Sequence, residues 1–168
     1  MKSGNTILLA IAFGCGFWGG YSFRGSQINP VREQTVLEQT AETYSIKKYV
    51  DGDTIDLNEG IEVLLYRIRL LGIDTDERGQ PLYREATEAL EELIDGNPIT
   101  LKKDPSRDLG DFRRPLRYIF IGETNINIEM VRLGYARTFM HEGLMYEKEF
   151  LEAEREAKEK RLGIWDLP

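Results

Sequence analysis

DGDT at residues 51–54 and RLLGIDTDE at residues 69–77 decide the fold of this chain and point to its chemistry. Each stretch places carboxylates beside a turn or a strand end, and one expected hairpin separates the two. Carboxylates that converge in this way bind a hard cation such as Ca²⁺ or Mg²⁺, whereas zinc takes His and Cys ligands. Arg69 begins the second stretch, and a cationic side chain beside a metal site suits a centre that handles phosphate. Either stretch alone is an ordinary turn or loop signal, but the pair in this order predicts a site.

Length and charge limit the classes of protein to which this chain can belong. Its 168 residues suffice for one domain of ordinary size plus an N-terminal appendage. The net charge of −7 argues against a protein that coats a nucleic-acid duplex, because such proteins are basic. Between residues 102 and 117, however, six basic side chains stand against three acidic ones. A small basic site on an acidic body suits an enzyme that holds one or two phosphates through a metal and arginines.

Cysteine and histidine chemistry is not expected to underlie the function. Cys15 is the only cysteine, so the chain has no internal disulfide. His141 is the only histidine, and no nucleophile motif surrounds it. Because a lone histidine is usually structural or solvated, we expect no catalytic role for His141.

The N-terminal segment, residues 1–23, is expected to form a hydrophobic helix. Residues 3–23 carry no charge and are about long enough to span a bilayer, and aromatic residues at the end of the run favour an uncleaved signal anchor. A cleaved signal peptide and lipid modification of Cys15 stay open as alternatives. Residues 24–42 are polar and contain Pro30, which indicates a linker. We therefore expect membrane contact through this segment and an extracytoplasmic domain, or a secreted protein if the segment is cleaved.

The folded domain is expected over residues 43–168. Side chains with strand preference gather between turn signals at residues 44–50, 54–57, 61–73, 99–103 and 116–121. Apolar side chains recur at helical spacing over residues 81–95, 126–133 and 146–160. Short strands with one interposed helix and two later helices predict an α+β fold, in which the helices pack on a small sheet.

These stretches resemble the staphylococcal-nuclease (thermonuclease) family. Its pattern is an Asp-Gly-Asp-Thr turn, followed by Arg, four mostly apolar residues, Asp, a small residue, Pro and Glu. The resemblance extends from about residue 44 to residue 165 and includes the closing Gly-Ile-Trp at residues 163–165. It implies a five-stranded OB-type β-barrel with about three packed helices. It also implies a calcium-dependent endonuclease that hydrolyses DNA and RNA with little sequence preference and leaves 3′-phosphate ends. We expect a monomer without a protein partner.

The resemblance assigns the metal ligands to the two carboxylate stretches. Asp53, Asp74 and the backbone carbonyl of Thr75 correspond to the Ca²⁺ ligands of the family, and Asp51 to a carboxylate close by. Asp76 stands where the family usually has Pro, so this loop carries one more carboxylate. This carboxylate either adds a metal ligand or shifts the metal preference toward Mg²⁺ or Mn²⁺, so the choice of metal stays open.

The resemblance also assigns the catalytic residues. Arg69 and Arg114 correspond to the two arginines that hold the phosphate, and Glu77 to the residue proposed as general base for the attacking water. Arg113 stands where a Gly commonly precedes the second arginine, so Arg113 and Arg114 are alternatives for that role. Two guanidinium groups and a divalent cation would neutralise a phosphodiester and stabilise the extra charge of its transition state.

Aromatic residues that would contact the nucleotide fit the family less well. Phe112 stands where the family has an aromatic near the sugar or base, and core packing is the alternative for this side chain. Met140 and Glu142 stand where the family has stacking tyrosines, with Phe139 one residue away. We therefore expect base stacking to be the feature least retained from the family.

Two other functions stay open from the sequence. One is a catalytically weak nuclease-like module that binds nucleic acid or protein partners at a membrane, and the other is a membrane-tethered Ca²⁺-binding protein without turnover. A binding module need not keep the acidic and basic site residues, and a pure cation site has no use for arginines. The chain keeps both kinds of residue, which favours a metal-dependent nuclease.

Overall fold

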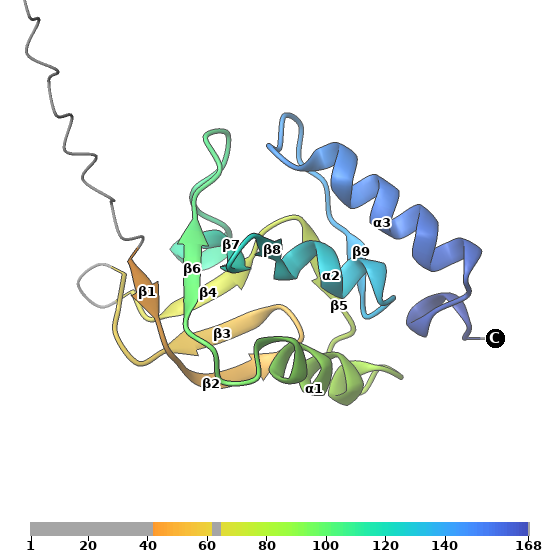
Figure 1. Ribbon diagram of the computed structural model, residues 1–168, viewed down its shortest axis with the longest axis horizontal. Helices are drawn as coiled ribbons and strands as arrows, with labels where there is room; N and C mark the ends of the chain where they lie inside the picture. The colour runs from red at the N-terminus through yellow and green to blue at the C-terminus, as the bar shows by residue number, and fades with distance from the viewer. Residues whose placement is uncertain (1–41, 62–64, 168) are drawn as a thin grey trace, which may run out of the picture. The chain divides into compact units, whose positions relative to one another are not determined.

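The computed structural model describes residues 42–61 and 65–167, and these residues belong to one compact unit (Figure 1). The hydrophobic helix predicted at residues 1–23 lies outside the described residues, and so does the linker as far as residue 41. Within the described ranges, no helix has both the length and the apolar character that a membrane crossing requires. The membrane anchor, and with it the location of the domain, stays a prediction.

The described residues contain nine short strands. They are β1 (Thr43–Tyr44), β2 (Ile46–Asp51), β3 (Thr54–Leu57), β4 (Arg67–Leu70), β5 (Ile73–Thr75), β6 (Ile99–Lys102), β7 (Leu116–Ile121), β8 (Thr124–Asn125) and β9 (Ala136–Thr138). The main sheet has the order β1-β6-β7-β4-β3-β2, with β8 paired to β7, and β5 pairs with β9 in a separate two-stranded sheet. Only the pairing of β4 with β7 is parallel among these strands. Two of the five predicted strands are each divided into two shorter segments, and β8 and β9 were not predicted from the sequence.

The strand predicted at residues 61–73 is divided in the structure. β4 ends at Leu70, and β5 begins at Ile73 after a turn at Gly72. Gly72 has a φ of +84°, and a Cβ there would lie 2.9 Å from the ring of Phe150. The turn takes β5 away from the main sheet to pair with β9, a strand not predicted from the sequence.

The three predicted helices are confirmed, and with them the α+β class. They are α1 (Tyr83–Ile94), α2 (Ile126–Arg132) and α3 (Glu147–Glu159), and two short 3₁₀ turns cover Asp111–Arg113 and Gly163–Trp165. Asn125 begins α2, because its side-chain oxygen accepts the backbone N–H of Ile128. Figure 1 shows α2 between the strands of the main sheet and α3, with α1 along the lower edge of the unit.

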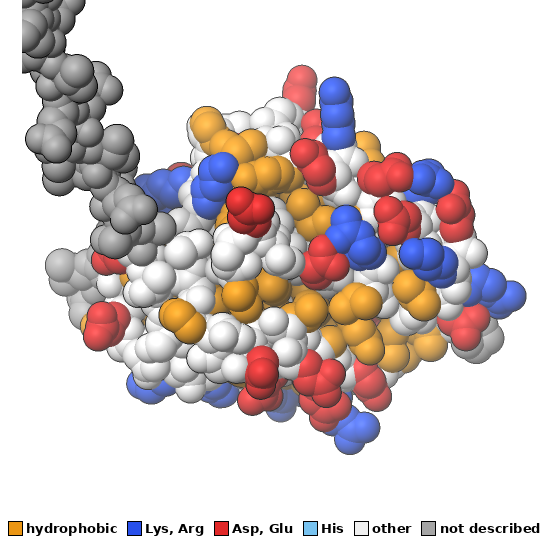
Figure 2. Space-filling model, viewed as in Figure 1, with side chains coloured by type: hydrophobic (Ala, Val, Ile, Leu, Met, Phe, Trp, Pro, Cys, Tyr) orange, Lys and Arg blue, Asp and Glu red, His pale blue; other side chains and the backbone are white. Residues whose placement is uncertain are grey.

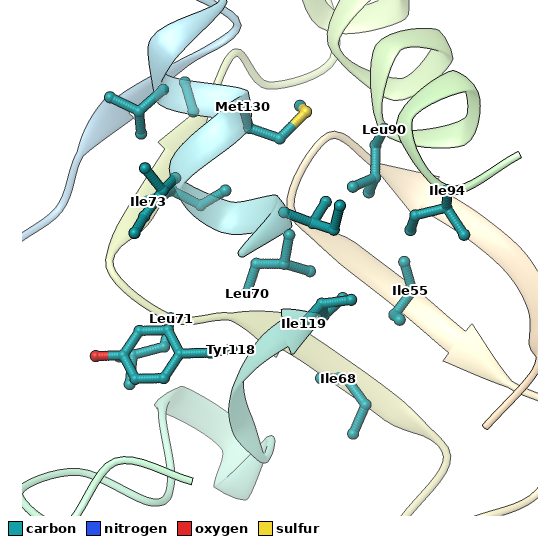
Figure 3. Packing of buried hydrophobic residues seen from close by; sticks show 14 of the residues in the cluster. Ile55, Ile68, Leu70, Leu71, Ile73, Leu90, Ile94, Tyr118, Ile119 and Met130 are labelled. Carbon is teal, nitrogen blue, oxygen red and sulfur yellow. The ribbon is translucent and has the colours of Figure 1, made fainter. Parts of the chain in front are cut away.

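The core lies where α1 and α2 meet the main sheet (Figure 3). Leu90 and Ile94 stand one turn apart on α1 and point toward Ile55 of β3, and all three side chains are fully buried. Met130 of α2 and Ile73, at the start of β5, are buried in the same cluster. Each such side chain contributes roughly 1.5–3 kcal/mol by leaving water. The core therefore holds the helices against the strands that carry the functional residues.

Asn127 fastens α2 to the end of β4. Its buried side-chain oxygen accepts the N–H of Ile119 at 2.9 Å. Its amide nitrogen donates to the carbonyls of Leu71 and Arg117, at 2.9 and 3.1 Å. A buried amide whose hydrogen bonds are all made fixes its neighbours without a desolvation penalty. These hydrogen bonds hold in place the turn after Leu71, which lies within the second carboxylate stretch.

Some of the acidic side chains of α3 form ion pairs within the helix or with the residue that follows it. Glu154 pairs with Lys158, and Glu156 with Lys160, one helical turn apart. Figure 2 shows acidic and basic side chains interspersed on the face in view. With six acidic and three basic side chains, α3 still carries a net charge of −3.

Candidate active site

The stretches at residues 51–54 and 69–77 converge on a pocket of about 270 Å³. The loop before β7 and the residues after β9 complete its lining. Its charged side chains are five carboxylates and three guanidinium groups, from Asp51, Asp53, Asp74, Glu77, Asp111, Arg69, Arg107 and Arg114. With all of them ionised, the pocket has an excess of two negative charges, which one divalent cation would balance.

Asp53 is held in the pocket wall by the turn between β2 and β3. Its buried Oδ2 accepts hydrogen bonds from the backbone N–H and the hydroxyl of Thr75, at 3.0 and 3.1 Å. Its Oδ1 accepts a hydrogen bond from Thr54 Oγ1 at 3.0 Å. Gly52 lets the turn come this close, because a Cβ there would lie 2.7 Å from the Cβ of Ala86. The DGDT stretch thus supplies both the turn and the buried carboxylate.

Burial raises the pKa of Asp53 to about 6, while Arg69 acts in the opposite direction and Asp51 adds to the rise. The guanidinium of Arg69 therefore does not offset the rise in pKa that burial and the nearby carboxylate of Asp51 cause. An ionised carboxylate in this condition is stabilised by any further positive charge that approaches it. The electrostatics of Asp53 favour the binding of a cation.

Arg69 stands between two carboxylates. β4 pairs with β3 at Arg69 and Thr54, and with β7 at Arg69 and Leu116, so the strand register places this side chain beside the β2–β3 turn. Its Nη1 forms an ion pair with Asp53 Oδ2, and its Nη2 donates to Asp74 Oδ1 at 3.0 Å. The Arg69 side chain is largely buried, whereas that of Asp74 is about half exposed. One planar fork thus contacts both predicted ligands, which a lysine cannot reproduce.

Oxygen is the ligand type at this end of the pocket, which suits Ca²⁺ or Mg²⁺ rather than zinc. Within residues 42–61 and 65–167, no three side chains of His, Cys, Asp or Glu gather closely enough to form a complete metal site. Asp53 and Asp74 are brought together around Arg69, and Thr75 meets Asp53 through its N–H and hydroxyl. The carbonyl of Thr75 as a third ligand stays a prediction. Two carboxylates fit a cation that also takes carbonyl and water oxygens.

Glu77 and Asp51 line the same pocket. Glu77 begins a turn in which the N–H of Gln80 donates to its carbonyl at 2.9 Å, and the residue is exposed to solvent. Asp51 accepts the backbone N–H of Asp53 at 3.1 Å, so it helps to shape the β2–β3 turn. An exposed carboxylate at a pocket is accessible to water, which suits the role of general base predicted for Glu77.

The loop before β7 places Arg114 in the pocket lining, and Arg113 is not part of that lining. The Nε of Arg114 is buried without a hydrogen-bond partner. Phe112 and Arg113 have φ of +56° and +57°, a left-handed conformation that costs about 1–2 kcal/mol for a residue with a side chain. Phe112 is 94% exposed, so core packing as the explanation of this residue is wrong.

Asp76, which the sequence suggested as an additional metal ligand, does not line the pocket. Its side chain binds other residues of the protein instead. Its Oδ1 accepts a hydrogen bond from Arg137 Nη1 at 2.9 Å, and its Oδ2 accepts the backbone N–H of Leu82 at 3.2 Å. β5 and β9 pair with Asp74 opposite Arg137, which brings the two side chains of the ion pair together. Asp76 therefore ties the segment before α1 to β9, and thereby positions Asp74 and Glu77 on either side of it.

Arg137→Ala is expected to lower the free energy of unfolding by about 3 kcal/mol, because it leaves a buried carboxylate without its counter-charge. Asp76 is 4% exposed and Arg137 45%, so Asp76→Ala should cost less, since the guanidinium can regain water. The double variant should recover part of the loss. Denaturant unfolding measures all three, and equal losses in the two single variants would contradict this account.

Arg107, Phe139 and His141 also line the pocket and were not predicted from the sequence. The N–H of Phe139 donates to the carbonyl of Gly72 at 2.9 Å, which holds the chain after β9 at the pocket. Phe139 and His141 face the pocket and meet edge to face, with ring centroids 5.1 Å apart, while Met140 packs against the core. An alternation of this kind along a strand would have predicted that Phe139 and His141 share one face. β9 has only three residues, which is too short for the pattern to be recognised in the sequence.

The geometry can be compared with known proteins. A family model described as staphylococcal nuclease homologue matches residues 67–167, which include β4 and every later element. An uncharacterized protein of Methanocaldococcus jannaschii is 32% identical over 161 residues, which cover 79% of this chain and 76% of that protein. Micrococcal nuclease of Shigella flexneri is 32% identical over 130 residues, 73% of each chain. Thermonuclease of Staphylococcus intermedius is 29% identical over 133 residues, which cover 74% of this chain and 77% of that protein.

Proposed function

This chain belongs to the staphylococcal nuclease homologue family, and on that premise we propose that it is a Ca²⁺-dependent nuclease that hydrolyses DNA and RNA. The observation that carries the proposal is Arg69 between Asp53 and Asp74, in a pocket that also contains Glu77 and Arg114. Carboxylates suited to a cation and guanidinium groups suited to phosphate meet in one place. The names of two relatives, micrococcal nuclease and thermonuclease, support this activity.

Arg69 and Arg114 bind the scissile phosphate in this proposal. Arg114 forms no ion pair within the described part of the chain, and its buried N–H would be satisfied by a phosphate oxygen. Arg69 is already held at the carboxylates, so little of its side-chain freedom is lost when the substrate binds. Asp53, Asp74 and the carbonyl of Thr75 would hold a divalent cation, which would supply further stabilisation of the charge that develops at phosphorus.

Glu77 accepts the proton of the attacking water. Its carboxylate is solvent-exposed and lines the pocket, so a water molecule can lie between it and a bound phosphate. The water oxygen attacks phosphorus, the bond from phosphorus to the 5′ oxygen breaks, and that oxygen takes up a proton from solvent. The products are a 3′-phosphate and a 5′-hydroxyl.

Exposed aromatic side chains favour unpaired bases as substrate. Phe139 lines the pocket and is 53% exposed, and Phe112 stands between the lining residues Asp111 and Arg114. Aromatic rings stack on unpaired bases with little regard to sequence. We therefore infer little sequence preference and faster cleavage of single strands.

We also infer that the main sheet is an OB-type barrel in which β1 and β2 act as one bent strand. β1 pairs with β6, β2 pairs with β3, and Ser45 alone separates the two strands. The two ends of the sheet therefore belong to one continuous stretch of chain, which supports closure through the backbone.

The full chain, incubated with labelled single-stranded DNA or RNA, tests the proposed function. We expect cleavage with Ca²⁺, 3′-phosphate ends on the products, and no cleavage with a chelator. Parallel reactions with Mg²⁺ and Mn²⁺ decide the metal preference. Tight binding without cleavage under every metal would favour the binding module instead, and full activity in chelator would rule out the metal.

Arg114→Ala is expected to reduce the rate of cleavage by about 10²–10³, because it removes a group that stabilises charge at phosphorus. Arg113→Ala should be much milder, since Arg113 does not line the pocket. Arg113→Gly should raise the free energy of unfolding by about 1 kcal/mol, because glycine adopts a positive φ without strain. Initial rates on single-stranded DNA and denaturant unfolding measure these effects. If Arg113→Ala loses more of the cleavage rate than Arg114→Ala, the second phosphate-binding arginine is Arg113 and not Arg114.

A further inference from the structure

We propose that Arg107 and His141 form a second anion subsite in the pocket, which binds the phosphate next to the scissile one along a nucleic-acid strand. This inference rests on the proposed function, because it concerns the substrate of the same pocket. A substrate that carries this second phosphate is then preferred over one that has the scissile bond alone.

Arg107 is a cation without a partner in the pocket. Its Nε is buried and has no hydrogen-bond acceptor. In the part of the chain that the structure describes, no Asp or Glu forms an ion pair with it, whereas Arg69 pairs with Asp53 and Asp74. A partly buried guanidinium with an unsatisfied N–H is costly in the free protein, and an anionic ligand removes that cost.

The acids nearest in sequence to Arg107 are engaged by other residues. Asp108 pairs with Lys103 and with Arg117, at 3.1 and 2.6 Å. Asp104 is buried and accepts hydrogen bonds from several donors, namely the side chain and N–H of Ser106, Tyr118 Oη and the N–H of Met145. Neither acid therefore neutralises the positive charge of Arg107, which lines the pocket.

His141 lies close enough to Arg107 to be affected by its charge. Burial lowers the pKa of His141, and Arg107 lowers it further, so the imidazole is neutral at neutral pH. A neutral imidazole does not repel the guanidinium and offers one N–H donor to a phosphate oxygen. The edge-to-face contact with Phe139 fixes the position of the ring.

The place of Arg107 points to a neighbouring phosphate rather than the scissile one. Arg69 and Arg114 already bind the scissile phosphate in the proposed function, so Arg107, which lines the same pocket, is left for another phosphate of the strand. The pocket of about 270 Å³ is close to the size of a small-molecule site, roughly 300 Å³ and above, and exceeds the needs of one phosphate. Since every nucleotide of a strand brings a phosphate, a strand with one phosphate at Arg69 brings a second into reach.

Kinetics on short DNA substrates test the subsite. TpT has a single phosphodiester, and pTpT and TpTp carry a further phosphate on the 5′ or the 3′ side. With Ca²⁺, the wild-type chain should cleave one of the extended substrates with a kcat/KM about tenfold above that of TpT. Arg107→Gln should bring this ratio close to one, mainly through the KM of the extended substrate. The preferred extension shows on which side of the scissile bond the subsite lies.

Arg113→Gln is the matched control, because it removes one positive charge from the same loop but from outside the pocket lining. This variant should keep the preference for the extended substrate. Binding of the same three dinucleotides in the presence of chelator, followed by NMR titration, gives a second readout that needs no turnover. Wild type should bind the preferred extended dinucleotide about tenfold more tightly than TpT, and Arg107→Gln should not.

Equal ratios for wild type and Arg107→Gln, in cleavage and in binding, would overturn the subsite. A fall in kcat on TpT with the ratio retained would overturn it as well, because Arg107 would then act at the scissile phosphate. The failure of the proposed function is a different result. In that case neither protein cleaves any substrate, while Arg107→Gln still abolishes the tighter binding of the extended dinucleotide.

Discussion

Arg69→Lys is expected to lose about 10²–10³ of the cleavage rate at saturating substrate while the protein stays folded. The guanidinium contacts Asp53 through Nη1 and Asp74 through Nη2, and a single ammonium group cannot keep both contacts and still bind phosphate in a planar fork. The charge beside the buried Asp53 is kept, which limits the loss of stability. The loss should appear in kcat more than in KM, because the group acts mainly in the transition state. A rate near wild type, with weakened substrate binding, would contradict a catalytic role.

Arg67→Lys is the control for this prediction. Arg67 lies two residues earlier on β4, is half exposed, and binds Asp56 through Nε and Nη2, at 2.7 and 2.8 Å. It is a paired arginine of the same strand and does not line the pocket. Its replacement should leave the cleavage rate close to that of wild type, so that a loss at Arg69 can be attributed to the site.

Asp53→Asn is expected to weaken Ca²⁺ binding and to reduce cleavage by about 10²–10³, without lowering stability in chelator. The carboxylate is buried, and its ionised form is opposed by burial and by Asp51. A neutral amide relieves both effects and can still accept a hydrogen bond from Thr75. Calcium titration and single-stranded DNA cleavage measure the losses. Unchanged calcium binding and activity would remove Asp53 from the metal site.

The pH dependence of stability gives a second measure of Asp53. Because its folded-state pKa is raised from 3.8 to about 6, protonated Asp53 stabilises the metal-free fold below pH 4, and this stabilisation is lost as the pH rises through 6. The loss amounts to about 3 kcal/mol. Denaturant unfolding in chelator at pH 4.5 and pH 7 should show this component in wild type and not in Asp53→Asn. The same pH dependence in both proteins would contradict the assignment.

Asp56→Asn, three residues further along the chain on β3, is the matched comparison with the opposite sign. The hydrogen bond from Arg67 lowers the pKa of Asp56. The ionised Asp56 therefore stabilises the fold above its unfolded pKa, and this contribution is lost as the pH falls. Asp56→Asn should remove stability at neutral pH and leave intact the change between pH 4 and 6 that belongs to Asp53.

Local signals were enough to find the three helices, the locations of the five predicted strands along the chain, and the charged residues of the two carboxylate stretches. Arg69 and the carboxylates stand in two short stretches whose turn and strand preferences are encoded within a few residues. The three helices were predictable for the same reason, since Ala86, Leu90 and Ile94 repeat at helical spacing and are buried in the structure. The bend at Gly72 was only partly predictable, because its conformation depends on the ring of Phe150, far along the chain.

The positions of several residues in and near the pocket are determined by contacts between segments that are distant in the sequence. Asp76 reads as one more acid of the metal loop, but the pairing of β5 with β9 brings it to Arg137. His141 reads as a lone solvated histidine, yet the chain after β9 places it in the pocket beside Phe139. No local pattern identifies these partners, since each contact joins residues on separate elements.

The sequence by itself determined the family, the α+β class and the order of the acids and of Arg69 along the chain. Only the tertiary structure decided that Arg69 stands between Asp53 and Asp74, that Asp76 faces away, and that Arg107 and His141 join the pocket. Arg107 and His141 lie in loops, whose path is set by the elements that they join. For the residues on strands, the physical reason is register. A shift of one residue turns every side chain of a strand to the opposite face, and register between distant strands is set by the packing of the whole domain.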